Sequence, residues 1–120
     1  RDEALRRLRL RAMDIVVDAY NAQERAMGWY DYLEEQLQFP FTATCIATRA
    51  ISPLHVNDEV EVIGMPGEEE CEHEMFVTIR WEQEGLAVPL SQLNSISTTD
   101  EQTKQAIEDW HYWVTMGYEF

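Results

Sequence analysis

Apolar residues recur at helical spacing over the first third of the chain. Between residues 3 and 20 they lie three or four positions apart, with arginines and acids between them, which predicts an amphipathic helix. A second helix is expected over residues 22–38. Asn21 followed by Glu24 resembles a capping box at its start, and Pro40 prevents its continuation.

From residue 41 to 97 the pattern changes to short segments with strand character. Residues 59–63 alternate charged and apolar side chains, as a half-exposed strand does. β-Branched and aromatic residues are frequent in the other segments. The sequence Glu-Gln-Glu-Gly at 82–85 is suited to a hairpin turn. We therefore expect five antiparallel strands, at residues 41–48, 59–63, 75–81, 86–90 and 95–97.

A last helix is expected over residues 100–116. Thr98 and Glu101 form a second capping-box pair, and Gly117 can end the helix. Five short strands in about 60 residues are typical of small barrels. The sequence therefore predicts one α+β domain over residues 1–120: a small SH3-like antiparallel β-barrel or sheet, flanked by two N-terminal helices and one C-terminal helix.

The chain is strongly acidic, with 23 Asp and Glu against nine Lys and Arg, a net charge of −14. Such a field attracts cations and basic proteins and repels nucleic acid and anionic lipid, so we expect calcium ions or a basic protein as partners, with no nucleic acid and no membrane. Two cysteines and the lack of a signal-peptide pattern favour a cytoplasmic location. Five of the nine basic residues crowd into the first helix: Arg1, Arg6, Arg7, Arg9 and Arg11.

Residues 57–74 contain eight acids and no Lys or Arg. Four of these acids follow Pro66-Gly67 within five positions: Glu68, Glu69, Glu70 and Glu72. Carboxylates this close repel each other by about 1 kcal/mol per pair. Calcium converts the repulsion into coordination, because it takes six to eight oxygens in irregular geometry. The alternative is a solvated acidic loop that keeps an edge strand from aggregating.

A second acidic group, Asp31, Glu34 and Glu35, lies toward the C-terminal end of the second helix. Acids are unfavourable there, because that end carries partial negative charge and these acids are also i,i+3 and i,i+4 neighbours. A bound cation would relieve both effects. The alternative is that an arginine of the first helix crosses over and neutralises the group.

Motifs for other chemistry are weak. Zinc could be bound near Cys71 and His73, with Cys45, His55 or His111 as further ligands, but no CxxC pair is present. The chain has no EF-hand loop, nucleophile elbow, phosphate-binding loop, HExxH or dinucleotide fingerprint. We therefore expect that the protein is not an enzyme.

Several blocks of residues, in order along the chain, carry a family resemblance. They lie at residues 32–35, 39–41, 59–65, 71–77, 79–81 and 85–93, with further agreement in the tail from residue 110. Together they resemble the bacterial CcbP calcium-binding protein family, from about residue 15 to 93. The resemblance implies a small acidic protein that holds calcium outside EF-hands. The family pattern favours Asp where this chain has Glu35 and Gly where it has Asn57.

The resulting hypothesis is a calcium-binding protein that acts as a buffer or sequestering protein. Its alternative is an SH3-like interaction module whose acidic face docks a basic partner without metal. The candidate calcium ligands are Asp31, Glu34, Glu35, Glu68, Glu69, Glu70 and Glu72.

Overall fold

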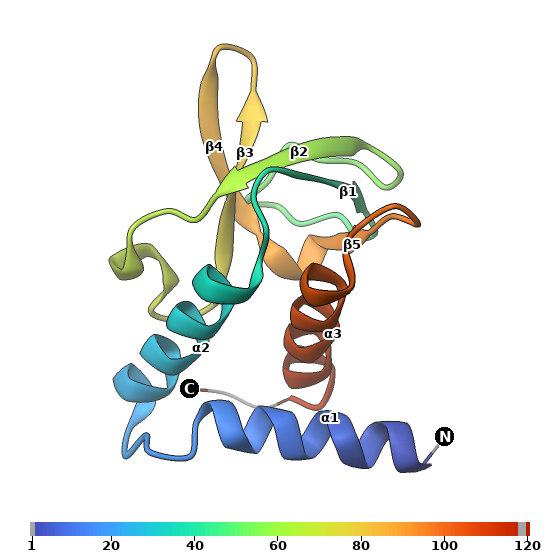
Figure 1. The fold of residues 1–120 in the computed structure, drawn as a ribbon. Coiled ribbons are helices and arrows are strands. Elements are labelled where there is room, and N and C mark those ends of the chain that lie inside the picture. Colours follow the sequence, from blue (N-terminus) through green and yellow to red (C-terminus); the bar gives the residue numbers. More distant parts are fainter. Residues whose placement is uncertain (1, 118–119) are drawn as a thin grey trace.

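The structure is a computed structural model that describes residues 2–117 and residue 120 (Figure 1). No helix in these ranges is long and apolar enough to cross a membrane. The elements, in chain order, are α1 (Asp2–Ile15), α2 (Ala22–Gln36), β1 (Phe41–Cys45), β2 (Glu59–Gly64), the 3-10 turn η1 (Glu68–Cys71), β3 (Phe76–Trp81), β4 (Glu84–Pro89), the 3-10 turn η2 (Leu90–Gln92), β5 (Leu93–Ser95) and α3 (Glu101–Thr115).

The caps of α2 and α3 differ in how well the sequence predicted them. Asn21 caps α2 as expected, because its side chain accepts a hydrogen bond of 2.9 Å from the backbone N–H of Glu24. The Glu24 carboxylate in turn accepts a bond from the N–H of the residue before the cap. The prediction for α3 was wrong by two residues: Asp100, not Thr98, caps this helix and accepts from the backbone N–H three residues later.

The first helix ends at Ile15, five residues earlier than predicted. Residues 16–18 form a turn, after which α2 starts at residue 22 and passes close to the end of α1. The approach is close: a Cβ at Gly28 would lie 2.9 Å from the carbonyl oxygen of Ile15. Figure 1 shows α1 lying across the ends of α2 and α3 that are remote from the sheet.

The five strands form one antiparallel sheet in the order β4-β3-β2-β1-β5. The expected hairpin is confirmed as a two-residue turn, because Trp81 pairs with Glu84 and leaves only residues 82 and 83 in the loop. Two strands are displaced from their predicted ranges: β1 ends at Cys45, and β5 occupies 93–95. The sheet is not closed, so the structure confirms an antiparallel α+β fold and does not confirm the barrel.

An aromatic cluster joins α2 to α3 beneath the sheet. Trp29 of α2 is fully buried. Its ring centroid lies 5.1 Å from that of Trp110 and 5.5 Å from that of Trp113, both on α3. Aromatic burial of this extent dominates core energetics. The cluster therefore fixes the orientation of α2, the helix that carries three of the candidate ligands.

Candidate metal centre

The two acidic segments predicted from the sequence meet where α2 contacts η1. The link is Tyr30, a largely buried residue of α2, whose hydroxyl donates a hydrogen bond of 2.6 Å to the carbonyl oxygen of Pro66. Pro66 lies two residues before η1. A buried hydroxyl that is satisfied by a backbone carbonyl holds the start of the acidic loop against the helix.

The electrostatic environment of Tyr30 shows which acids gather at this contact. Its pKa is raised, first by burial and then by the nearby charges of Glu34, Cys71, Glu68 and Glu69. Like charges around a phenol disfavour its ionised form. The charges of Glu34, Glu68 and Glu69 therefore all act on Tyr30, although more than 30 positions separate Glu34 from the other two along the chain.

A small hollow of about 100 Å³ lies between α2 and η1. The Glu69 side chain folds back over Gly67: a Cβ built at Gly67 would lie 2.5 Å from the Glu69 Oε1 atom. The absence of a side chain at Gly67 therefore leaves room for this carboxylate. We call this region, together with Tyr30 and Glu34, the α2–η1 interface. The hollow is lined by Gln23, Ala26, Met27, Glu68, Glu69 and Glu72.

Three of the seven candidate ligands thus line the hollow of the α2–η1 interface, Glu68, Glu69 and Glu72, and the charge of a fourth, Glu34, acts on Tyr30 beside it. Asp31 follows Tyr30, and Glu35 follows Glu34, so each points about 100° further around α2. Both Asp31 and Glu35 are exposed. Glu70 is exposed as well, and its charge acts on the buried Cys71 instead. Within residues 2–117 and 120, no three acidic, His or Cys side chains already form a ligand group, so ligation requires these exposed side chains to rotate.

None of the seven candidate ligands has a basic partner within 4 Å in the described part of the chain. The alternative of a neutralising arginine from α1 is wrong for the arginines that the structure describes. Arg11 does cross from α1, but its Nε atom lies 3.1 Å from both carboxylate oxygens of Asp109 on α3. Among the described residues, Asp31, Glu34 and Glu35 of α2 make no ion pair.

Basic residues neutralise other acids of the 57–74 segment. Arg80 Nε lies 2.6 Å from Glu61 Oε1, across β3 and β2. Arg49 makes two hydrogen bonds of 2.8 and 3.0 Å to the two carboxylate oxygens of Glu74. The sequence could not distinguish these paired acids from the unpaired ones, because both arginines lie far from their partners in the chain.

Asp109 is an ionisable residue that the sequence interpretation missed. Its side chain is fully buried, and it accepts hydrogen bonds from Arg11 and from the hydroxyl of Tyr32, which links α1, α2 and α3. Burial, followed by the hydrogen bond to Asp109, raises the pKa of Tyr32 to about 12. A signal was present, since Asp109 follows Ala106 by three positions and precedes Trp113 by four, on the apolar side of α3.

The cysteines and histidines do not converge. Cys71 is buried and its sulfur accepts from a backbone N–H at the start of β3, whereas His73 is exposed. Cys45 is buried in β1, and His55 is exposed. His111 Nε2 lies 2.6 Å from a backbone carbonyl of β5. The zinc hypothesis gains no support, because no group of three ligands forms within the described ranges.

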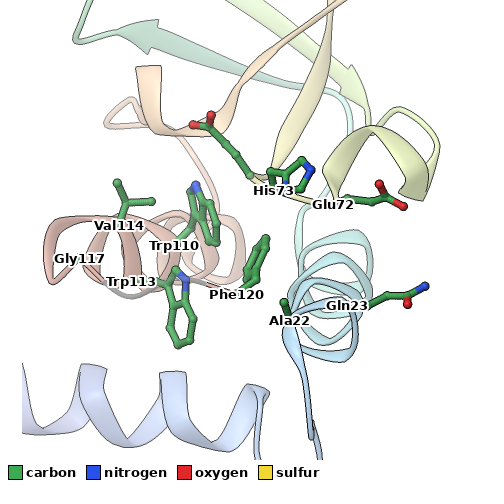
Figure 2. A pocket seen from close by; sticks show the side chains of 10 residues that line it. Ala22, Gln23, Glu72, His73, Trp110, Trp113, Val114, Gly117 and Phe120 are labelled. Atoms are coloured by element: carbon green, nitrogen blue, oxygen red, sulfur yellow. The ribbon is translucent and has the colours of Figure 1, made fainter.

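A larger hollow of about 820 Å³ lies between the start of α2, the η1–β3 connection and α3 (Figure 2). Its floor is aromatic: the rings of Trp110, Trp113 and Phe120 stand together, with Glu72 and His73 above them. Glu74 also lines it, but Arg49 holds that carboxylate. An aromatic floor with one free acid does not suit a hard cation, which needs several oxygens.

Comparisons with known proteins show which family this chain resembles in sequence and in fold. A family model described as calcium binding, that of CcbP, matches residues 9–114. A solved structure described as a calcium binding protein in the calcium-binding form is 35% identical, with a TM-score of 0.81; the match covers 94% of this chain and 93% of that one. The crystal structure of Anabaena CcbP is 37% identical over 88% of this chain and 85% of its own, with a TM-score of 0.75. No curated protein matches. This chain belongs to the CcbP family of calcium-binding proteins.

Proposed function

We propose that the protein binds calcium at the α2–η1 interface, with Glu34, Glu68, Glu69 and Glu72 as the principal ligands. The observation that supports the proposal is that Glu68, Glu69 and Glu72 line one hollow beside Tyr30, on which the charge of Glu34 also acts, and that none of these acids has a basic partner within 4 Å among the described residues. Membership of a calcium-binding family supports the choice of ion.

The chemistry favours calcium over smaller or softer ions. Four carboxylates offer up to eight oxygens, and calcium accepts six to eight oxygens with variable geometry. Magnesium requires near-ideal octahedral geometry and keeps its waters, while zinc prefers nitrogen and sulfur. Glutamate side chains on a short 3-10 turn can rotate toward a common point, which suits the less demanding ion.

The remaining candidates, Asp31, Glu35 and Glu70, lie outside this first site. In our proposal, their charge raises the local concentration of calcium and can hold a second, weaker ion at the exposed side of α2. Ligands that must rotate and desolvate on binding give modest affinity, so we expect a dissociation constant of about 10⁻⁶ M or weaker. Weak, acid-rich sites suit a buffer or sequestering protein in the cytoplasm better than a switch.

We also propose that the strands adopt an SH3-like arrangement. The strand order β4-β3-β2-β1-β5 and the 3-10 turn η2 immediately before β5 support it. In this interpretation the entire chain is one calcium-binding domain without catalytic activity.

Calorimetric titration of calcium into the metal-free protein tests the proposed site. Glu34→Gln/Glu69→Gln should weaken binding by about tenfold or more, because two of four anionic ligands become neutral. Glu82→Gln/Glu84→Gln, on the exposed β3–β4 turn, is the matched control and should change the affinity little.

Two outcomes would contradict the proposal in different ways. No heat and no thermal stabilisation of the parent protein at millimolar calcium would reject calcium binding. Unchanged affinity in the double variant would reject the location of the site. Salt-sensitive capture of a basic protein that persists in EGTA would instead support the interaction-module alternative.

A further inference from the structure

The helix α1 has an outer face that nothing in the described part of the chain covers. Its inner face carries the fully buried Ala12, with Leu8 and Ile15 partly buried. Leu10 lies about 160° around the helix from Ala12 and is 53% exposed, and Met13 beside it is 41% exposed. Figure 1 shows α1 along one end of the molecule, so this outer face points away from the body.

Charges of both signs lie around Leu10 on this face: Arg7 and Asp14, with the exposed Glu3 and Arg6 also within about 40° of Leu10 around the helix. Arg7 and Asp14 lie seven positions apart, which places them on the same side of the helix and about 10 Å apart along its axis. That separation is too large for them to pair with each other. Both are exposed, and neither makes an ion pair within the described residues.

We propose that this face, made by Arg7, Leu10, Met13 and Asp14, pairs with the same face of a second copy of the chain in antiparallel orientation. A two-fold axis that passes close to Leu10 brings together the same sides of the two helices. Arg7 of each copy then lies opposite Asp14 of the other, and two ion pairs form at once. The apolar side chains of Leu10 and Met13 are buried between the helices.

The contact is small, and its strength is limited accordingly. Fourteen residues of helix span about 21 Å, which gives an interface below the size of stable dimers. The net charge of −14 on each copy opposes association, but it acts over a Debye length of only about 8 Å in a molecule that measures 39 × 33 × 25 Å. We expect a dissociation constant of about 10⁻⁴ M, within the range of sedimentation equilibrium.

Charge exchange tests the geometry directly. In sedimentation equilibrium up to about 1 mM protein, in EGTA, the parent chain should dimerise. Arg7→Asp and Asp14→Arg should each weaken dimerisation by about tenfold, because every reversal turns both ion pairs into repulsions. An equimolar mixture of the two variants should associate again, since one copy then presents two acids and the other two arginines.

The controls separate this contact from other causes. Leu10→Glu should abolish dimerisation, whereas Glu84→Arg on β4 should leave it nearly unchanged. Circular dichroism of each variant checks that α1 is retained. A parent chain that stays monomeric at 1 mM, or single variants that do not complement each other, would overturn the proposal. Neither result bears on calcium affinity, which calorimetry measures separately.

Discussion

Replacing Tyr30 by Phe removes one hydroxyl from the α2–η1 interface and leaves the ring in place. The lost interaction is the 2.6 Å hydrogen bond to the carbonyl of Pro66. The net value of such a bond is about 1 kcal/mol, and Pro66 is only partly buried, so water can replace the donor. We therefore expect the free energy of unfolding to fall by about 1 kcal/mol or less.

The effect on calcium follows from the position of this bond. In our proposal, Glu68 and Glu69 must stay beside Glu34 to share an ion, and the Tyr30 hydroxyl holds their segment there. Without the hydrogen bond, calcium binding has to fix the position of this segment itself. The free energy of calcium binding then becomes less favourable by the free energy that the hydrogen bond contributed. A cost of about 1 kcal/mol corresponds to about a fivefold weaker dissociation constant.

Tyr32→Phe is a matched control, because it removes a hydroxyl from the same helix two residues away. That hydroxyl donates to Asp109 of α3 and accepts from Arg11 of α1, and within the described residues it makes no hydrogen bond to η1. Tyr32→Phe should therefore destabilise the fold without changing calcium affinity, as measured by urea unfolding and calorimetry. If Tyr30→Phe left the affinity unchanged, or if both variants weakened it equally, the assigned role of Tyr30 would be wrong.

Three further predictions concern the contacts that hold the helices. Asp109→Asn should lower the free energy of unfolding by about 2 kcal/mol in urea titrations, and by clearly less when Arg11 is already Met, because the two charges stabilise each other. The folded state raises the pKa of Tyr32 from 10 to about 12. The Tyr32 hydroxyl therefore contributes its full stabilisation below pH 10, and this contribution is lost as the pH rises toward 12. The difference in the free energy of unfolding between the parent and Tyr32→Phe should shrink over that interval. Gly28→Ala should destabilise by about 1 kcal/mol despite the better helix propensity of Ala, since its Cβ would lie 2.9 Å from the Ile15 carbonyl; a stabilised variant would show that α1 can shift freely.

The parts of the fold that the sequence predicted are those set by local chemistry. Asn21 and Glu24 determine the start of α2, and the alternation of residues 59–63 determines β2. The end of α1 was not predictable in this way, because residues 16–20 continue the apolar spacing and the helix stops only where α2 must pass close to it. The barrel was inferred from strand number, which does not determine whether a sheet closes.

The candidate site shows the same division between local and long-range information. The density of Glu68, Glu69 and Glu72 marks the acidic loop from sequence alone, whereas its juxtaposition with Glu34 depends on the packing of α2. Ion pairs between residues that are far apart in the sequence determine which acids are neutralised and which are not. Residue 57 is an intermediate case: Asn57 has a positive φ of 80°, a backbone conformation that Gly adopts without strain, and the sequence gives no sign of this beyond the residue type.

In the part of the chain that the structure describes, the acids of the α2–η1 interface have no basic partner within 4 Å. Arg11, Arg49 and Arg80 each neutralise an acid elsewhere in the fold, so the convergent carboxylates repel one another in the metal-free protein. Monovalent salt weakens that repulsion only by diffuse screening. The screening becomes stronger as the salt concentration rises, and the Debye length falls to about 3 Å at 1 M. A coordinated divalent ion acts directly between the oxygens. Sodium chloride should therefore raise the melting temperature of the metal-free protein gradually up to molar concentrations, whereas calcium should do so by the millimolar range and in a saturable way. Equal responses to the two salts at equal ionic strength would show that the carboxylates form a diffuse acidic surface and no site.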